Sequence, residues 1–527
     1  MVRDMAEEIR RLPVGVQSFE DLREGGFVYV DKTKYIYELA RRSKQYFLSR
    51  PRRFGKSLFL STLKAYWEGK KELFEGLEIA ELEKDNEKAF EAYPVFYFDF
   101  NGQNYQAAAL EDVLDKMLSR WEEQYDCKGQ GTLSGRFQDL LIAAREKTGK
   151  KCVVLVDEYD KPLLEVLENN ELEEHNKAVF KGFFGTLKSY DEYLQFVFIT
   201  GVTKFSKVSI FSDLNQLKDI SLQKSYSAIC GMTAEEICSH FQPELTRMAA
   251  EHNLSREECL QELARMYDGY HFSPDSAGIY NPFSVLNAMD SGNLSAFWFS
   301  TGTPTFLVRR LRNMHFDMRQ FGGQDIYAEE YVLTDYRGDN PDIIPLLYQT
   351  GYLTITGYDR EEQLYILGFP NAEVKYGFLK SLLPAYAPTA VTGSGKDVVT
   401  LRRRIRAGDV DGMLDALTAL FASIPYTTDD APFEHYFQSV IYIVFTLLGQ
   451  HTHCEVHSSR GRADCVLETD KFVYIFEFKV DKSAKEALEQ IEAKGYAAPF
   501  KADQRQIFKI GVNFDSEARS LSEWLVG

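Results

Sequence analysis

Two groups of side chains in this sequence have types and spacings that suit chemistry on phosphate groups. The first lies in residues 50–58, RPRRFGKSL, where Gly55, Lys56 and Ser57 open a helix-patterned stretch. Backbone N–H groups at such a turn bind phosphate oxygens, the lysine reaches the β- and γ-phosphates, and the hydroxyl binds Mg²⁺. We therefore predict a site for the phosphates of ATP, with Ser57 as a metal ligand. The predicted loop residues are Arg52, Arg53, Phe54, Gly55, Lys56, Ser57 and Leu58.

The loop departs from the full Walker A pattern GxxxxGK[ST], because Arg50 occupies the position of the first glycine. A short GKS match is weak by itself, but an apolar strand at residues 153–158, VVLVDE, strengthens it. At the carboxyl end of such a strand, Asp157 would hold Mg²⁺ and Glu158 would polarise the attacking water. The alternative is a buried strand followed by two solvated acids. Residues 200–203, TGVT, end the next strand, where a polar side chain could sense the γ-phosphate.

The second group lies near the C-terminus and combines two carboxylates with a lysine. Asp464 follows Gly-Arg-Ala, and Glu477 and Lys479 lie within the apolar stretch FVYIFEFKV at residues 472–480. Because side chains alternate along a strand, Glu477 and Lys479 are expected on one side of it. Asp464 and Glu477 could share Mg²⁺ or Mn²⁺ through their oxygens, and Lys479 could position a metal-bound water that attacks phosphorus. The alternative is a structural ion pair.

Two further residues extend this second group. Glu434 lies in a helix-patterned stretch at residues 431–445 and could supply a third metal-binding carboxylate, and Gln490 lies in another such stretch at residues 483–496. An ExK triplet alone occurs often by chance, so the prediction depends on the ordered set within a helix, strand, strand, helix pattern. That set is Glu434, Asp464, Glu477, Lys479 and Gln490.

Hydrophobic patterns indicate the elements that must position these groups. Apolar strand-like runs alternate with helix-like stretches in the first third, which predicts an α/β fold with a parallel sheet covered on both faces. The expected strands are residues 45–49, 93–100, 151–158 and 194–202. Helical patterns dominate from about residue 233, and residues 342–369 show a helix followed by two β-patterned runs, as in a winged helix. The small and polar residues 388–397 indicate a linker.

Composition limits the classes of function. The chain has 527 residues, which predicts several domains, and 61 basic against 79 acidic side chains leave a net charge of −18. This balance argues against general binding of polyanions, so nucleic acid would need a local basic patch. Arginines at residues 402–406 are one candidate, with a solvated helix face as the alternative. Scattered cysteines, no signal-like start and no apolar run long enough for a bilayer predict a cytoplasmic protein without membrane contact.

The two groups and the sequence around them resemble a bacterial and archaeal family of AAA-like ATPases fused to a C-terminal PD-(D/E)xK nuclease-like domain. The resemblance covers almost the whole chain, and so many short matches in one order are specific. The arginine at the first Walker A position belongs to the pattern of this family. The matching segments include VGVQSFEDLREGGFVYVDKT, RPRRFGKSL, LVDEYDKP, MYDGYHF, LYQTGYLTI, GRADCVL, YIFEFK and ALEQI.

The resemblance implies an α/β multidomain chain with a P-loop NTPase core, a helical lid, a winged-helix-like region and a restriction-endonuclease-like domain. The expected bounds are 1–230 for the core, 231–330 for the lid, 331–387 for the winged-helix-like region, 388–397 for the linker and 398–527 for the nuclease-like domain. It also implies site residues. These are Gly55, Lys56 and Ser57 for phosphates, Asp157 for magnesium, Glu158 for water, and Glu434, Asp464, Glu477, Lys479 and Gln490 for nuclease chemistry.

Three functions remain open on this basis. The first is an ATP-hydrolysing enzyme whose Mg²⁺- or Mn²⁺-dependent nuclease domain acts on DNA or RNA under ATPase control, with genome defence or mobile elements as the expected setting. The second is an ATP-dependent switch whose C-terminal domain binds nucleic acid or a partner without cleavage. The third is a scaffold with an inactive ATPase. A homo-oligomer is a further expectation, because AAA-like ATPases often act as oligomers.

Overall fold

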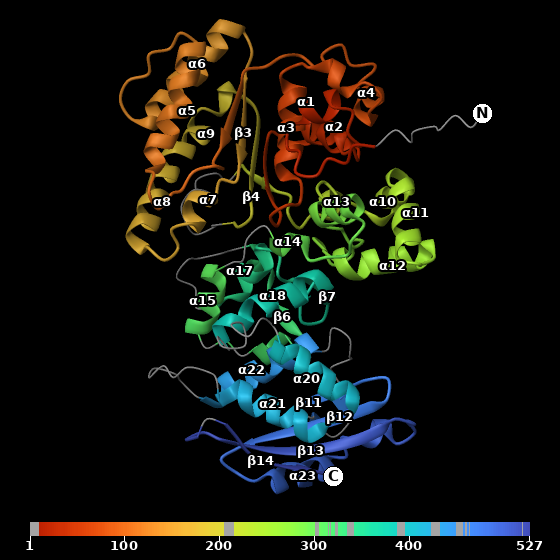
Figure 1. Ribbon diagram of the computed structural model, residues 1–527. Coiled ribbons are helices and arrows are strands. Elements are labelled where there is room, and N and C mark those ends of the chain that lie inside the picture. The colour runs from red at the N-terminus through yellow and green to blue at the C-terminus, as the bar shows by residue number, and fades with distance from the viewer. Residues whose placement is uncertain are drawn as a thin grey trace, which may run out of the picture. The chain divides into compact units, whose positions relative to one another are not determined.

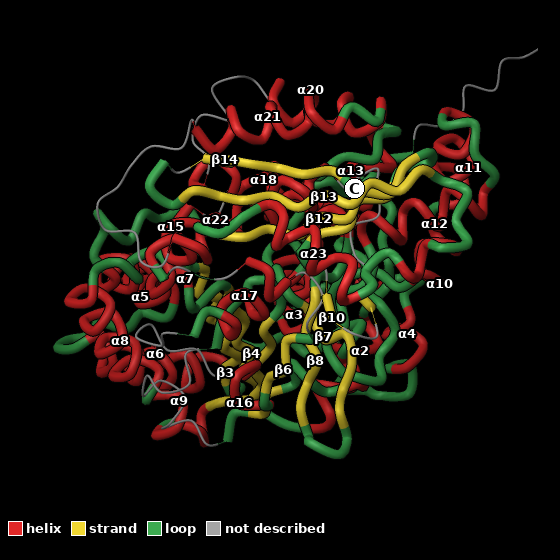
Figure 2. The backbone as a smooth tube through the Cα atoms, turned by 90° about the horizontal axis from the view of Figure 1, so that it is seen from below, coloured by secondary structure: helices red, strands yellow, loops and turns green. Residues whose placement is uncertain are grey.

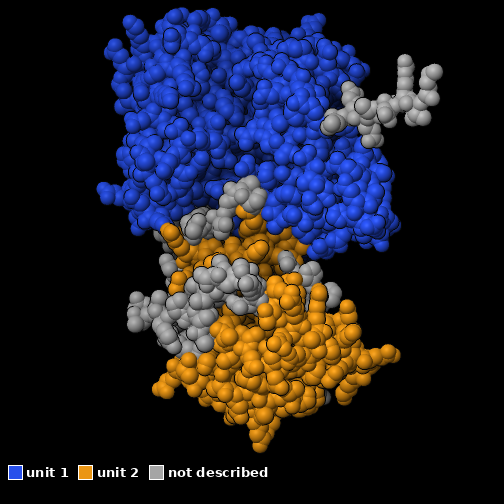
Figure 3. Space-filling model, in the orientation of Figure 1, with its two compact units in different colours: residues 1–298, 327–371 blue, residues 299–326, 372–527 orange. Residues whose placement is uncertain are grey.

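The computed structural model divides into two compact units (Figures 1 and 3). Unit 1 comprises Met1–Trp298 and Tyr327–Asn371, and unit 2 comprises Phe299–Ile326 and Ala372–Gly527. The five-part division expected from the sequence stays a prediction. The structure describes residues 10–204, 216–300, 305–314, 316, 318–321, 325–334, 342–386, 396–422, 433–448, 457–458, 461–462, 464–518 and 520–527.

Unit 1 is built on a five-stranded sheet with the order β2-β3-β4-β1-β5. Neighbouring strands run parallel, and their register pairs Ser49 with Gly201 and Asp99 with Asp157. The carboxyl ends of four strands therefore meet at one edge of the sheet. β3 is buried along its whole length, which confirms the predicted α/β architecture. The strands are β1 (Gln45–Ser49), β2 (Val95–Asp99), β3 (Cys152–Asp157), β4 (Leu194–Gly201) and β5 (Lys218–Asp219).

Helices cover both faces of this sheet (Figure 1). They are α1 (Phe19–Glu24), α2 (Thr33–Arg42), α3 (Lys56–Trp67), α4 (Glu78–Leu82), α5 (Leu110–Gln124), α6 (Leu133–Thr148), α7 (Lys161–Leu164), α8 (Asn170–Phe184) and α9 (Thr186–Ser189). On one face Phe98 packs on Trp121 of α5 and Phe183 of α8, with ring centroids 4.9 and 5.4 Å apart. On the other face Phe198 of β4 packs on Phe59 of α3 at 5.8 Å. Aromatic packing thus fixes α3, which follows the predicted phosphate loop, against the sheet.

A helical part of unit 1 follows the sheet, as the sequence pattern predicts from residue 233. Its helices are α10 (Ala234–His240), α11 (Gln242–Glu251), α12 (Arg256–Tyr267) and α13 (Pro282–Ser291). The short helix α14 (Phe297–Ser300) follows, and its last two residues are assigned to unit 2. Capping boxes begin two of these helices, at Thr233 with Glu236 and at Ser255 with Glu258. Their apolar faces share one buried cluster that includes Phe241, Leu245, Met248 and Leu263.

A helix and a hairpin complete unit 1. The order of α17 (Ile344–Gln349), β7 (Thr354–Asp359) and β8 (Leu364–Gly368) confirms the predicted helix followed by two strands. A three-stranded sheet has the order β6-β8-β7, with β6 at Ile326–Ala328 and α16 at Glu330–Thr334. Its assignment as a winged helix stays a prediction. In the described ranges no helix has the length and apolar character needed to cross a membrane.

Unit 2 contains a mixed four-stranded sheet with the order β11-β12-β13-β14. β12 and β13 run parallel, whereas the other neighbours are antiparallel. The strands are β11 (Cys465–Glu468), β12 (Phe472–Val480), β13 (Gln506–Asp515) and β14 (Ser520–Val526), and a separate pair is β9 (His457–Ser458) with β10 (Gly461–Arg462). The helices are α15 (Thr305–Asn313), α18 (Ala372–Tyr386), α20 (Lys396–Ala407), α21 (Val410–Ala422), α22 (Phe433–Leu448) and α23 (Ala484–Lys494).

The two faces of this second sheet are covered by different helices (Figure 2). Phe476 of β12 packs on Phe445 of α22 at 5.1 Å, whereas Val473 and Ile475 pack with Ile491 of α23. Because side chains alternate along β12, the odd-numbered positions face α23. The polar side chains of this strand at odd positions are therefore presented to α23.

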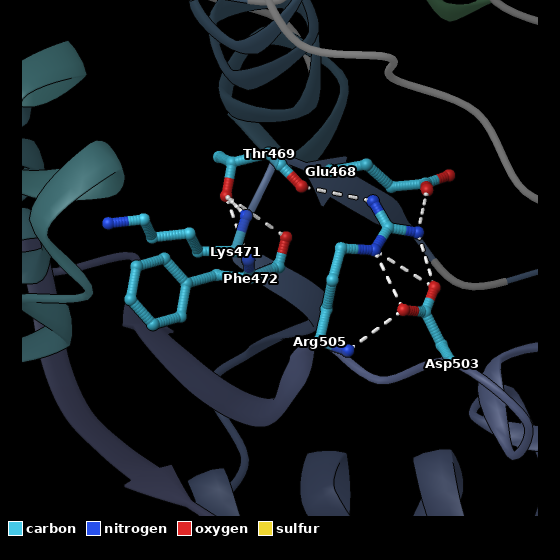
Figure 4. Close-up of polar contacts among 6 residues, drawn as sticks. All are labelled: Glu468, Thr469, Lys471, Phe472, Asp503 and Arg505. Carbon is cyan, nitrogen blue, oxygen red and sulfur yellow. Dashed lines mark hydrogen bonds and ion pairs between the residues drawn. The ribbon is translucent and has the colours of Figure 1, made fainter.

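An arginine fixes the turn between β11 and β12 (Figure 4). Arg505 donates to the carbonyl of Thr469 at 3.0 Å and to the Glu468 carboxylate at 2.6 Å, and it also binds Asp503. The backbone N–H of Thr469 donates to the carbonyl of Phe472 at 2.8 Å, and the Thr469 hydroxyl accepts from Phe472 N at 2.9 Å. These bonds set the register of the hairpin, on which the positions of its polar side chains depend.

Candidate phosphate-binding and metal-binding sites

The predicted phosphate loop connects β1 to α3, at the carboxyl edge of the parallel sheet. Gly55 precedes the helix with a φ of 89°, a backbone conformation that side chains with a Cβ disfavour. Helix α3 then begins at Lys56. The backbone N–H groups of its first turn have no partner within the helix. Lys56 is buried, and its Nζ donates to the carbonyls of Arg50 at 3.0 Å and Pro51 at 3.1 Å. The lysine therefore lies over its own loop, as a phosphate-binding lysine must.

The other predicted loop residues differ in what they present. Arg52 and Arg53 are exposed, so their guanidinium groups are accessible to an anion. The Phe54 side chain is buried, 4.7 Å from the ring of Tyr270, so any contact of Phe54 with a phosphate would come from its backbone. Leu58 is half-buried on the first turn of α3. The side chains of Phe54 and Leu58 thus serve packing, which sequence spacing alone could not separate from binding.

Asp157 lies at the end of β3 and is surrounded by hydroxyl groups. It is 1 % exposed, and its carboxylate accepts from Thr200 Oγ1 at 2.9 Å and from Tyr97 OH at 3.4 Å. Burial raises the pKa of Asp157, while a hydrogen bond from Ser57 and the charge of Lys56 act in the opposite direction. The structure therefore brings Lys56, Ser57, Asp157 and Thr200 together, and the side-chain oxygen atoms of Ser57, Asp157 and Thr200 suit a hard cation such as Mg²⁺.

Glu158, the predicted water-activating residue, follows Asp157 directly. Its φ of 47° lies in the left-handed region, which residues other than glycine rarely adopt. Such backbone strain is concentrated at functional sites, because the surrounding structure must stabilise it. The side chain is half-buried, and its charge contributes to raising the pKa of Asp157. Its position is thus compatible with the role expected from the sequence, which stays a prediction.

Two residues of this site were not identified from the sequence. Tyr97 reaches Asp157 from β2, and the only signal for it was its place within the predicted strand at residues 93–100. Asp160 is buried and accepts from the backbone N–H groups of Val202 at 3.0 Å and Thr203 at 2.6 Å. It therefore ties the segment after β3 to the segment after β4, a contact that depends on the tertiary fold.

The second group meets at the carboxyl end of β12 in unit 2. The register pairs Cys465 with Phe476, so Asp464 and Glu477 are the next residues on the two strands. Glu477 is 2 % exposed, and its Oε1 accepts from Lys479 Nζ at 2.8 Å and from Gln490 Nε2. Gln490 Oε1 in turn accepts from Lys479 Nζ at 2.7 Å. Four of the five residues predicted for this group therefore lie together.

The electrostatics of Glu477 are unusual. Burial raises its pKa to about 7, the negative charge of Asp464 adds to this, and Lys479 opposes it. Its second oxygen, Oε2, is buried and has no hydrogen-bond partner among the residues that the structure describes. A buried polar atom without a partner is costly and calls for an explanation, such as a bound ion. Asp464 Oδ2 accepts from the backbone N–H of Phe478 at 2.8 Å, which fixes the second carboxylate nearby.

These residues fit a divalent cation. The unpartnered Oε2 of Glu477 and the neighbouring Asp464 offer carboxylate oxygens, which Mg²⁺ and Mn²⁺ prefer. Within the described ranges no cluster of three or more His, Cys, Asp or Glu side chains could hold a metal ion. Glu434 lies on α22, but its side chain is outside the described residues, so its predicted role as a third ligand stays a prediction.

Comparisons with known proteins match the two regions of the chain in which these sites lie. A family model described as "Predicted AAA-ATPase" matches residues 13–211, and one described as "PD-(D/E)XK nuclease superfamily" matches residues 432–524. A protein of Azotobacter chroococcum mcd 1, described as "Uncharacterized protein in vnfD 5'region", is 35% identical over 530 residues, covering 98% of this chain and 99% of the relative. The resemblance expected from the sequence is confirmed. The chain therefore belongs to the family of predicted AAA-ATPases that carry a C-terminal domain of the PD-(D/E)XK nuclease superfamily.

Proposed function

We propose that this protein binds and hydrolyses ATP and cleaves phosphodiester bonds of nucleic acid at a second site that uses Mg²⁺ or Mn²⁺, under control of the nucleotide. The observation that carries the cleavage proposal is the buried Glu477, with one oxygen held by Lys479 and Gln490 and the other without a hydrogen-bond partner among the residues described in the structure. A structural ion pair would not need this second oxygen to be buried and unsatisfied.

At the first site the residues of the chain would act on the triphosphate as follows. Lys56 exchanges the carbonyls of Arg50 and Pro51 for phosphate oxygens, so its bonds are replaced rather than lost. Ser57 and Asp157 would hold Mg²⁺, which neutralises phosphate charge when it is bound. Glu158 orients the attacking water and accepts its proton.

At the second site each residue has a separate task. Glu477 and Asp464 would hold the divalent ion, which when bound supplies positive charge to the scissile phosphate and lowers the pKa of a bound water. Lys479 favours the ionised form of Glu477 against the effect of burial, and it presents an ammonium group beside the attacked phosphate. Gln490 holds Lys479 and Glu477 in place with its two amide atoms, as residues behind metal ligands commonly do.

The experiment uses the full chain with single- and double-stranded DNA and RNA, each with Mg²⁺ or Mn²⁺. We expect cleavage by the wild type and its loss in Lys479→Ala and Asp464→Ala. Lys485→Ala is the matched control, because Lys485 is an exposed lysine on α23 whose ion pair is with Glu489. Cleavage that survives in Asp464→Ala, or that Lys485→Ala removes equally, would contradict the proposed site.

A second function is favoured by the acidic balance of the chain, with a net charge of −18. In this alternative the protein is an ATP-dependent switch whose C-terminal domain binds nucleic acid or a partner without cleavage. It predicts ATP-dependent binding, no cleavage with any divalent metal, and equal Mn²⁺ titrations of the wild type and Glu477→Ala. A role in genome defence or with mobile elements remains a prediction under either function.

A further inference from the structure

Arg50 occupies the position where the Walker A pattern has its first glycine, and the function proposed above does not use its side chain. The guanidinium group is 1 % exposed. It donates to the carbonyls of Ser49 at 2.8 Å, Ser221 at 2.9 Å and Tyr226 at 2.9 Å, and it lies over the ring of Phe272 with its carbon 3.8 Å from the ring centroid. One side chain therefore connects the start of the phosphate loop with two distant segments of unit 1.

Burying this guanidinium is costly. Its hydrogen bonds to Ser49, Ser221 and Tyr226 all go to backbone carbonyls, and its Nε has no hydrogen-bond partner among the described residues. Burial lowers the pKa of Arg50 to about 10, so the group is still charged at neutral pH. A buried cation held mainly by carbonyls and an aromatic ring is unfavourable unless its surroundings are organised around it. Around Arg50, three backbone carbonyls and the ring of Phe272 lie where they can contact the guanidinium.

The same residue also contributes to the cradle of Lys56. The backbone carbonyl of Arg50 accepts from Lys56 Nζ at 3.0 Å. Arg50 is therefore fixed both by this bond to its carbonyl and by the hydrogen bonds that its own guanidinium donates. The loop residue Phe54 is also held by residues far along the chain. The carbonyl of Phe54 accepts from Gly231 N at 3.0 Å, and the Phe54 ring packs on that of Phe272 at 5.5 Å. A glycine at position 50 would keep these backbone and Phe54 contacts, but it could not make the three guanidinium hydrogen bonds or the contact with the ring of Phe272.

We propose that Arg50 is a positioning residue for nucleotide binding: it replaces the first Walker A glycine as the element that sets the loop conformation, and it links the loop to Ser221, Tyr226 and Phe272. The arginine is then a requirement of this loop and not a degeneration of the motif. This inference rests on the proposed binding of ATP at the loop. It assigns no direct contact between Arg50 and the phosphates, because the guanidinium is already bound to carbonyls.

The decisive variant is Arg50→Gly, which restores the full Walker A pattern. We expect the Kd and KM for ATP with Mg²⁺ to rise about ten-fold or more, because several buried hydrogen bonds are lost, while kcat changes little because Asp157 and Glu158 are untouched. Arg50→Lys, which keeps the charge but not the planar fork, should recover part of the affinity. Arg136→Lys is the control, since Arg136 pairs with Glu122 on the far helices α5 and α6. A loss of general stability alone would lower kcat through the active fraction and leave KM unchanged.

The outcomes separate the inference from the function on which it rests. If the wild type does not bind ATP, the proposed function is wrong. If the wild type binds ATP and Arg50→Gly binds it equally or more tightly, Arg50 is not a positioning residue. Should Arg50→Gly not fold, hydrogen exchange of the wild type decides. ATP should slow the exchange of amides in residues 221–226 and leave those of α6 unchanged, and equal exchange with and without ATP would overturn the link.

Discussion

The ammonium group of Lys479 lies 2.8 Å from Oε1 of Glu477, two positions before it on β12. This contact occupies one oxygen of a buried carboxylate, and Oε2 has no partner within the described part of the chain. The lysine therefore stabilises the charged form of Glu477 without blocking the oxygen that a cation would bind. This arrangement makes metal binding depend on the protonation of one residue.

The first prediction concerns pH. Because the pKa of Glu477 is raised to about 7, a proton competes with the metal below that pH, and Mn²⁺ affinity should fall about ten-fold per pH unit between pH 7 and 5. Isothermal titration of the wild type with Mn²⁺ measures this. Glu477→Gln should bind weakly at every pH, whereas an affinity that stays constant from pH 8 to 6 would contradict the assignment.

The same carboxyl predicts a stability effect without metal. Its pKa in the folded state lies above the value of about 4.3 in an unfolded chain, so the folded state binds the proton more tightly between these pH values. The contribution of Glu477 to stability is therefore present at low pH and is lost as pH rises through 7. Thermal unfolding of metal-free wild type should show a Tm that falls relative to that of Glu477→Gln between pH 5 and 8. Parallel Tm profiles would argue against this proton uptake.

A third prediction tests Gln490 as a positioning residue. Gln490→Ala removes both amide contacts, to Lys479 and to Glu477, and should reduce cleavage about 10- to 100-fold, the usual cost of losing a residue behind metal ligands. Glu489→Ala, at the neighbouring exposed position on the same helix, is the control. Cleavage rates at saturating Mn²⁺ check this, and equal rates for the two variants would remove Gln490 from the site.

A fourth prediction concerns Thr200 and the ATPase. Its hydroxyl donates to buried Asp157, so Thr200→Val should raise the pKa of that carboxyl further. The acid side of the pH profile of ATP hydrolysis is expected to move to higher pH, because protonated Asp157 no longer holds Mg²⁺. Thr200→Ser keeps the donor and should keep the wild-type profile. If the valine and serine variants have the same profile, the hydrogen bond does not tune Asp157.

A fifth prediction concerns the turn in Figure 4. Arg505→Met removes the bonds to Thr469, Glu468 and Asp503 and should lower the Tm of unit 2 by about 2–4 °C for each kcal/mol lost. Cleavage should fall as well, because the hairpin register brings Asp464 beside Glu477. Lys501→Met, at an exposed position in the same region, is the control. A stable variant with full cleavage would show that the register does not need this arginine.

The sequence predicted the elements whose signal is local. β3 and β12 follow directly from apolar runs, and the alternation along β12 correctly placed Glu477 and Lys479 on one side. Tyr97, Asp160 and the role of Arg50 could not be predicted, because each acts on a partner far away in the chain. The same reason applies to Tyr327–Asn371, which belongs to unit 1 through long-range contacts that no local pattern reports.

Because the two faces of β12 carry different kinds of side chain, the strand is sensitive to a shift of its register by one residue. Even-numbered residues such as Phe476 pack against α22, whereas the odd-numbered residues Glu477 and Lys479 near the end of the strand belong to the candidate metal-binding site. Inserting a single amino acid before Phe476 would move every later side chain of the strand to the opposite face, so Glu477 and Lys479 would face α22 and the phenyl rings of Phe476 and Phe478 would face α23. An insertion here is therefore expected to displace several side chains at once, whereas a substitution changes one side chain and keeps the faces of the others.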